Sequence, residues 1–410
     1  MLRHVLRTYQ AAFAGLPRDV WLLAGVALVN RSGSMVLPFI SLYLTEERGF
    51  SIALAGKLLA LYGIGSTAGS WLGGWSSDRF GADRTMAASL LVSGGCFVFL
   101  GLQRETWAIA LGVFTLAVTA DVFRPAVMAA MADRTPEALQ VRSFALLRLA
   151  INLGLTVGPA VGGLLAVRGY LWLFLVDGVT SWAAAALLLL RPRSAAAGAH
   201  ATLERPPAAS TPWTDGPFLT LLGLTFVLAA VFFQIVSTVP LYLRHAYGLR
   251  EDAIGGLLAL NAVIVVLFEM VLVHWAERRA RMPLIALGCF LVCAGFGLMP
   301  FGTSIAYAAF TVAVWSVGEM LSLPLINAVV ADRAGKGNRG RYMGLYTMSF
   351  STAFVLSPAA GTWIYDHVGR DELWYVVGLV GVPLALGALA LRRPVARGMP
   401  AGRGQTPPGL

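Results

Sequence analysis

Long apolar runs separated by short polar segments dominate the chain. Residues 21–44 and 219–243 are examples, and neither run alternates between apolar and polar positions. A membrane helix needs about 20 apolar residues, whereas a barrel strand needs about 10 alternating ones. The pattern therefore predicts an all-α membrane protein with twelve spanning helices, at residues 21–45, 53–75, 86–102, 107–132, 143–166, 170–190, 217–244, 252–275, 283–302, 305–330, 341–365 and 371–391.

Two stretches interrupt this pattern. Residues 191–216 are rich in Pro, Ala and Ser, which is typical of a flexible linker, and the last residues are rich in Gly and Pro. We therefore expect an N-terminal six-helix bundle (1–190), a cytoplasmic linker (191–216), a C-terminal six-helix bundle (217–391) and a disordered cytoplasmic tail (392–410).

Composition and charge agree with a membrane location. Of the residues, 57% are hydrophobic and 13% charged, compared with roughly 25% charged in soluble domains. The net charge of +10 does not indicate nucleic acid, because most of the arginines lie in segments between apolar runs. With both termini in the cytoplasm, 21 of the 31 Lys and Arg residues lie on that side, six lie outside and four lie within the predicted spans. The distribution predicts a multi-pass cell (inner) membrane protein with cytoplasmic termini.

Sequence signals for an enzyme are absent. No phosphate-binding loop and no cluster of His, Cys and acidic residues occurs, and Cys96, Cys289 and Cys293 fall inside apolar runs. We expect no enzymatic activity, no cofactor and no metal site.

The two halves repeat at an offset of 199 residues. Matching loop charges and prolines carry this signal, because matching apolar residues mean little in a membrane protein. The matched segments include 42–44 with 241–243, 78–79 with 277–278, 132–134 with 331–333, and 159–160 with 358–359. Two pseudo-symmetric bundles with a site between them are a recurrent plan of transporters.

Three motifs carry a resemblance to a known family. The segment Gly-Trp-Ser-Ser-Asp-Arg-Phe-Gly-Ala-Asp-Arg at 74–84 resembles the signature loop of the major facilitator superfamily. Gly158-Pro159 and Arg124-Pro125 are similar to motifs of its drug:proton antiporter branch. The resemblance covers the whole chain and implies the twelve-helix fold of that superfamily.

The resemblance also implies that the signature loop latches the two halves on the cytoplasmic side. Asp78 can pair with basic helix ends or cap a helix, while Gly74 and Gly81 permit close approach and a tight turn. The alternative is a loop that serves only topology and capping. The candidate gating residues are Gly74, Asp78, Arg79, Gly81, Asp133, Arg142, Glu277, Arg278, Asp332 and Arg341.

Helix five carries a stripe of small residues. Gly154, Gly158 and Gly162 are four apart and share one face, which allows another helix to approach closely. Pro159 weakens the backbone ladder and permits bending. Ordinary helix packing explains this motif as well as a role in antiport does.

Charges inside spans are costly and usually face a cavity. The candidates for substrate binding and proton coupling are Arg31, Asp121, Arg124, Glu269, Trp315 and Glu319. The basic members lie in the first half and both glutamates in the second, which predicts a bipolar cavity. A carboxylate whose arginine partner changes with conformation can take up and release a proton. We assign this coupling to Asp121 and Glu319.

Alternatives remain for several of these side chains. Asp121, three residues from Arg124, could form a fixed structural pair, and Glu269 could join the cytoplasmic charge network. Arg148 could extend to the cytoplasmic surface, and Asp177 is interpreted as a structural hydrogen-bonding residue.

Three functions fit this sequence. The first is proton-coupled efflux of small amphiphilic compounds by alternating access. The second is proton-coupled uptake of a peptide or another carboxylate-bearing nutrient, for which Arg31 would suit the carboxylate. The third is a non-transporting membrane sensor or scaffold. The expected partners are a small-molecule substrate, protons and the lipid bilayer, with no nucleic acid, and we expect a monomer.

Overall fold

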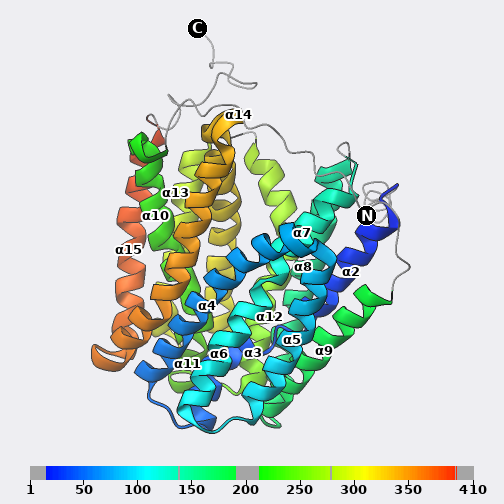
Figure 1. The fold of residues 1–410 in the computed structure, drawn as a ribbon. Coiled ribbons are helices and arrows are strands. Elements are labelled where there is room, and N and C mark those ends of the chain that lie inside the picture. The colour runs from blue at the N-terminus through cyan, green and yellow to red at the C-terminus, as the bar shows by residue number, and fades with distance from the viewer. Residues whose placement is uncertain (1–14, 137–138, 191–211, 278, 393, 395–410) are drawn as a thin grey trace, which may run out of the picture.

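The first bundle consists of helices α2 to α9 (Figure 1). The computed structural model describes residues 15–136, 139–190, 212–277, 279–392 and 394. We number the spans 1 to 12 in chain order. Spans 1 to 6 are α2 (Arg18–Ser32) with α3 (Val36–Leu42) and a π-helical turn (Tyr43–Glu47), α4 (Ile52–Phe80), α5 (Ala82–Leu102), α6 (Thr106–Asp121) with α7 (Phe123–Arg134), α8 (Gln140–Ala166) and α9 (Leu171–Leu189).

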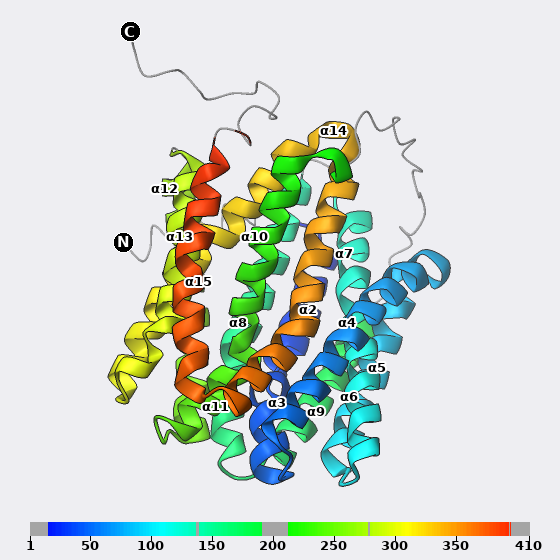
Figure 2. The same cartoon turned by 90° about the vertical axis from the view of Figure 1, so that its left-hand side faces the viewer.

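The second bundle repeats this order (Figure 2). Spans 7 to 9 are α10 (Gly216–Phe232) with a 3₁₀ turn (Phe233–Val236) and α11 (Thr238–His245), α12 (Glu251–Glu277) and α13 (Arg281–Gly297). Spans 10 and 11 are the two arms of α14 (Ile305–His367), and span 12 is α15 (Arg370–Ala390). Ten helical segments of the described chain are long and apolar enough to cross a membrane, and α13 is a shorter apolar helix. The predicted all-helical, twelve-span architecture is confirmed.

Helix α14 differs from the sequence prediction. We expected separate helices at 305–330 and 341–365, but the helical backbone continues through the connection between them. A straight helix of 63 residues would be about 95 Å long. Instead α14 turns back on itself, so that its two arms lie as neighbouring spans (Figures 1 and 2). The segment 74–84, expected as a loop, is also helical except at Gly81, because α4 ends at Phe80 and α5 begins at Ala82.

The predicted linker and tail fall largely outside the described residues. Of residues 191–216, only the end is described, where Pro212–Thr214 forms a 3₁₀ turn before α10. Of the tail, only Arg392 and Pro394 are described. We call the face where α9 ends and α10 begins the linker side, and the opposite face, where α11 ends, the far side.

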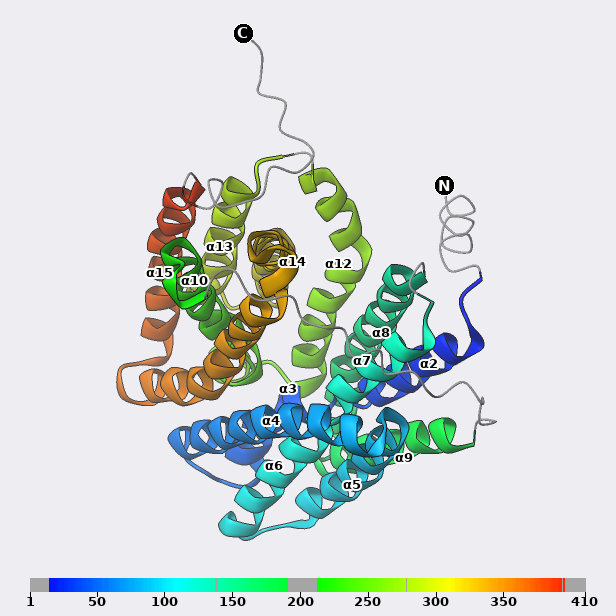
Figure 3. The ribbon, with the colours of Figure 1, turned by 45° about the horizontal axis from the view of Figure 1, so that its top comes forward.

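The buried apolar residues show that the bundles join on the far side. One cluster includes Phe39, Leu59 and Phe174 of the first bundle together with Leu241 and Ile254 of the second. A separate cluster contains only first-bundle residues from the linker-side ends of its helices. Viewed toward the linker side, helices α10 to α15 gather on one side of the molecule and α2 to α9 on the other (Figure 3). The two halves are therefore packed together on the far side.

The first span of each bundle is broken at an equivalent place. Span 1 is interrupted at residues 33–35, and span 7 leaves α-helical geometry at residues 233–237. Subtracting 199 from the second range gives 34–38, so the two breaks overlap in the repeat. A break in a spanning helix exposes backbone polar groups, which the protein must satisfy internally.

Candidate functional site

A cavity of about 400 Å³ lies between the two bundles. Spans 1 to 6 line it from one side and spans 7, 8 and 10 from the other. Its wall is mostly apolar, with few polar groups, an arrangement typical of small-molecule sites. The polar lining side chains include Asn30, Arg31, Tyr62, Asn152, Asn261 and Glu319.

Arg31 supplies the positive charge of the first-bundle wall. It lies in the last turn of α2, directly before the break in span 1, and is half-buried. Asn30 lines the cavity beside it.

Glu319 supplies the acidic group of the second-bundle wall. The amide Nδ2 of Asn261 donates to Glu319 Oε2 at 3.0 Å and also reaches Ser316 Oγ at 2.9 Å. The hydroxyl of Ser316 donates to Val312 O within its own helix. The structure therefore brings Arg31 and Glu319 to one cavity from opposite bundles, as expected of a bipolar site.

Asp121 and Arg124 do not line this cavity. Helix α6 ends at Asp121 and α7 begins at Phe123, and Val122 between them keeps α-helical backbone angles (φ −60°, ψ −33°). The two charged residues are therefore three apart along one span. No ion pair joins them among the described residues, and Arg124 is exposed.

Trp315 also lies away from the cavity. Its ring stacks on Phe296 with centroids 4.5 Å apart, and the side chain is fully buried. Its place one turn from Glu319 on the same helix does not bring it into the site, because the ring points into the core of the second bundle.

Glu269 forms an ion pair with Arg148 that connects α12 to α8, and so joins the two bundles. The Glu269 side chain is 11% exposed, whereas that of Arg148 is 59% exposed. Glu269 follows Asn261 by eight residues, so it lies about 12 Å farther toward the linker side. It is not a cavity residue.

The segment resembling a signature loop has a different geometry from the one expected. Gly81 joins α4 to α5 at a φ of +87°, a conformation that favours glycine. Gly74 faces open space, so the expected close approach there is wrong. The close contact is at Gly73, where an added Cβ would lie 2.5 Å from Pro125 Cγ.

Asp78 and Arg79 occupy the last turn of α4 and are exposed. The Arg79 guanidinium lies over the Trp75 ring, 5.6 Å from its centroid. The acid that forms an ion pair here is Asp83, with Arg134 at the end of α7.

The second bundle has its own linker-side pairs. Arg281 Nη1 lies 2.5 Å from Asp332 Oδ2, so the partner of Asp332 comes from span 9. Asp215, the N-cap of α10, receives two hydrogen bonds of 2.6 Å from the guanidinium of Arg333, and one from Tyr342. Burial raises the pKa of Asp215, but these hydrogen bonds outweigh it and leave the pKa below its ordinary value. Like the Asp83–Arg134 pair, these pairs connect helices of one bundle.

Among the remaining candidate gating residues, Asp133, Arg142 and Arg341 form no ion pair with a described residue. Asp133, Arg142 and Arg341 are exposed. Glu277 ends α12, and Arg278 lies outside the described residues.

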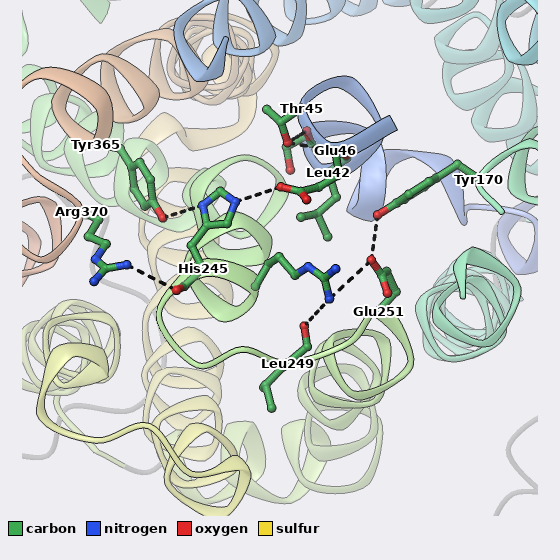
Figure 4. Close-up of polar contacts among 11 residues, drawn as sticks. Leu42, Thr45, Glu46, Tyr170, His245, Leu249, Glu251, Tyr365 and Arg370 are labelled. Atoms are coloured by element: carbon green, nitrogen blue, oxygen red, sulfur yellow. Dashed lines mark hydrogen bonds and ion pairs between the residues drawn. The ribbon is translucent and has the colours of Figure 1, made fainter. Parts of the chain in front are cut away.

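Sequence reasoning missed a group of polar contacts that joins the bundles on the far side (Figure 4). His245 Nε2 lies 2.9 Å from Glu46 Oε1 of the first bundle, and its other ring nitrogen lies 3.2 Å from the Tyr365 hydroxyl. Tyr170 of the first bundle donates to Glu251 Oε1 at 3.1 Å. Burial and the neighbouring Glu251 raise the pKa of Tyr170, so the phenol remains a donor. The signal was available in the repeat, since Glu46 and His245 are 199 residues apart.

The bundles also touch through glycines at two equivalent crossings. An added Cβ on Gly255 of α12 would lie 2.3 Å from the carbonyl oxygen of Pro159 in α8. An added Cβ on Gly56 of α4 would lie 2.9 Å from the carbonyl oxygen of Pro358 in α14. Gly56 and Gly255 are 199 residues apart, and so are Pro159 and Pro358, so the two crossings are equivalent in the repeat.

The glycine stripe of α8, which was predicted as helix five, packs against span 1. A Cβ added to Gly154 would lie 2.6 Å from Arg31 Cβ. A Cβ added to Gly158 would lie 2.9 Å from Ser34 O, and one added to Gly162 would lie 3.0 Å from Met35 Cβ. The stripe therefore forms the surface against which the break in span 1 rests.

The family model of the Major Facilitator Superfamily matches residues 21–351 and 318–408. The chain belongs to the Major Facilitator Superfamily. It is accordingly a secondary transporter rather than an enzyme, and a multi-pass membrane protein.

Curated relatives of this superfamily cover most of the chain. It is 25% identical to an uncharacterized MFS-type transporter, YqjV of Bacillus subtilis, covering 88% of this chain and 91% of that protein. It is 25% identical to a Na(+), Li(+), K(+)/H(+) antiporter of Planococcus maritimus (82% and 87% covered), and 24% identical to the multidrug resistance protein MdtH of Klebsiella pneumoniae (88% and 90% covered).

Solved structures of low identity share the fold. A peptide transporter POT in complex with sulfate superposes with a TM-score of 0.79 at 16% identity, covering 94% of this chain and 96% of that one. A point mutant of the nucleoside transporter NupG gives a TM-score of 0.77 at 13% identity, with 91% and 100% covered.

Proposed function

We propose that the protein exports small amphiphilic compounds in exchange for protons. The observation that carries this proposal is Glu319, a carboxyl group in a mostly apolar cavity that accepts a hydrogen bond from the neutral amide of Asn261. A neutral donor leaves the carboxyl free to exist with or without its proton. A proton and a positively charged amphiphile can therefore compete for the same group.

The apolar lining supports the amphiphilic part of this proposal. Aromatic and aliphatic side chains from both bundles, among them Phe97, Leu116, Phe232 and Ile235, surround the two charged groups. Such a wall binds apolar surface without strict geometry, whereas Glu319 would select for positive charge. The multidrug and cation/proton transporters among the relatives agree with this reading.

We assign the linker side to the cytoplasm, because most of the arginines and lysines lie there. The far side is closed by the shared apolar core and by the Glu46–His245 and Tyr170–Glu251 contacts. The structure then corresponds to a state that faces inward. Opening to the outside would require these contacts to break, while the crossings at Gly56 and Gly255 act as pivots.

The linker-side charges would form the opposite gate. In this structure their ion pairs stay within single bundles, as at Asp83–Arg134 and Arg281–Asp332. The exposed side chains of Asp78, Asp133, Arg142 and Arg341 are free to meet when the bundles close on this side. Arg148–Glu269 already joins the bundles and would keep them in register.

Uptake of a peptide or another carboxylate-bearing nutrient is the second candidate. Arg31 favours it, since a guanidinium facing the cavity can bind a carboxylate in a bidentate manner. The fold shared with peptide transporters is compatible with it.

A flux assay separates these directions. Purified protein is reconstituted in liposomes, and ethidium serves as the amphiphilic cation. We expect protons to move down an imposed proton gradient and ethidium to move across the membrane in the opposite direction. Movement of a dipeptide together with protons, and none of ethidium, would support the second candidate and contradict the first. Absence of flux with bound ethidium would favour a sensor.

A further inference from the structure

Asp177 of α9 accepts hydrogen bonds from the backbone of a different helix. Its Oδ2 lies 2.9 Å from Val36 N and 3.1 Å from Met35 N, and its Oδ1 lies 3.1 Å from Met35 N. The residue is 1% exposed. Met35 and Val36 begin the second part of span 1, where the break removes the usual carbonyl partners of these N–H groups. Asp177 therefore satisfies backbone donors that would otherwise be unpaired inside the membrane.

Span 6 also fixes the position of the break sterically. An added Cβ on Gly33 would lie 1.8 Å from Thr180 Oγ1, one turn along α9 from Asp177. On the other side, the break rests on Gly154 and Gly158 of α8, which is span 5. The backbone that follows Arg31 is thus held between two helices, with Asp177 as its polar anchor.

The repeat shows that this anchor belongs to the first bundle alone. The position equivalent to Asp177 is Val376, and the position equivalent to Arg31 is Ala230. In the second bundle the polar group at the break is Gln234, which lies on span 7 itself, donates to Ser357 Oγ at 2.9 Å and accepts from the hydroxyls of Ser237 and Thr238. Between the two described breaks, the one that is bonded by a carboxylate from another helix is therefore the one that carries a charged side chain to the cavity.

We propose that Asp177 is a positioning residue that holds the break in span 1 and thereby aims Arg31 and Asn30 into the substrate cavity. The effect on substrate binding rests on the proposed function, whereas the effect on the backbone of span 1 does not. A carboxylate suits the role because both of its oxygens accept, so that one side chain serves two adjacent N–H groups. Asn at this position keeps one accepting oxygen, and Ala keeps none.

The first test is structural and needs no substrate. Hydrogen–deuterium exchange is followed by mass spectrometry on peptides containing residues 33–42, in wild type, Asp177→Asn, Asp177→Ala and the matched control Ser181→Ala. Ser181 lines the same cavity from the same helix. We expect exchange at Met35 and Val36 to rise about tenfold or more in Asp177→Ala, less in Asp177→Asn, and not in Ser181→Ala. Unchanged exchange in Asp177→Ala would overturn the anchoring.

The second test concerns Arg31 and uses ethidium transport. We expect Asp177→Asn to raise the KM for ethidium by several-fold with little change in maximal rate, while proton coupling persists. Loss of proton-driven transport with an unchanged KM would make Asp177 a proton carrier and would overturn the positioning role. If wild-type protein moves no ethidium, the proposed substrate class fails, and labelling of Ser34→Cys by N-ethylmaleimide decides instead. A labelling rate that Asp177→Asn changes several-fold supports the positioning role, and a labelling rate equal to that of the protein with Asp177 contradicts it.

Discussion

Glu46 and His245 meet across the two bundles at 2.9 Å, although they occupy equivalent positions of the repeat, 199 residues apart. Equivalent residues can touch only near the axis that relates the two halves. The pair therefore marks the place on the far side where both bundles close on one another. The Tyr365 hydroxyl beside His245, and the Arg370 guanidinium on the His245 carbonyl oxygen, hold the histidine in place from spans 11 and 12.

Removing this contact should favour opening on the far side. We expect Glu46→Gln and His245→Gln each to raise several-fold the rate at which a membrane-impermeant maleimide, added from the far side, labels Ser34→Cys. The native cysteines are replaced beforehand, and Glu105→Gln, an exposed acid on the same side, serves as the control. Equal labelling rates in all variants would contradict a closing role for the pair.

The crossing at Gly255 should tolerate no side chain. An added Cβ would lie 2.3 Å from the Pro159 carbonyl oxygen, whereas the adjacent Gly256 has open space around its own Cβ position. We expect Gly255→Ala to destabilise this conformation by about 1–3 kcal/mol, as overpacking does. Gly256→Ala should lie near wild type. Thermal melting in detergent measures both, and equal melting temperatures would show that the crossing is not tight.

The hydrogen bonds to Asp215 predict a pH dependence of stability. A carboxyl group whose pKa is lowered on folding stabilises the native state above its unfolded value, here 3.8, and loses that contribution as the pH falls through the folded value. Asp215→Asn should therefore lower the melting temperature by a few degrees near pH 7, and the difference from wild type should shrink below about pH 4. Asp366→Asn, at an exposed acid, is the control. A difference that is independent of pH would indicate that the carboxylate charge does not contribute.

The Arg148–Glu269 pair predicts a charge-exchange result. Glu269→Arg should slow transport strongly, because it places two positive charges against each other between α8 and α12. Adding Arg148→Glu should restore much of the rate, since the pair is formed again in reverse. The coupling is read from the initial rates of the two single variants and the double variant. Additive losses in the double variant would mean that the two residues do not act as a pair.

The fold could be predicted from the sequence because the length of the apolar runs matches the thickness of the membrane. The repeat of loop charges predicts two equivalent bundles. Even the broken first helices lie at repeat-related positions. The continuous turn of α14 was not predictable, because its connecting segment contains three glycines and polar residues that suggest a break. Tertiary packing overrides that local preference.

The site was predictable only in part. Arg31 and Glu319 were identified because charge inside a span is costly unless it faces a cavity or a partner. Spacing alone could not show that Asp121 and Arg124 lie outside the cavity, or that Trp315 points into the core. Partners chosen by three-dimensional packing, such as Asp177 with Met35 or Asp83 with Arg134, leave no trace in residue spacing.

Proton coupling at Glu319 is tested by comparing two kinds of ethidium transport in Glu319→Gln proteoliposomes. We expect transport driven by a proton gradient to be abolished, while exchange of ethidium between equal pools persists, because the amide cannot take up a proton. Asp121→Asn, at a carboxylate outside the cavity, should retain both activities. Full gradient-driven transport in Glu319→Gln would contradict the assignment of proton coupling to this residue.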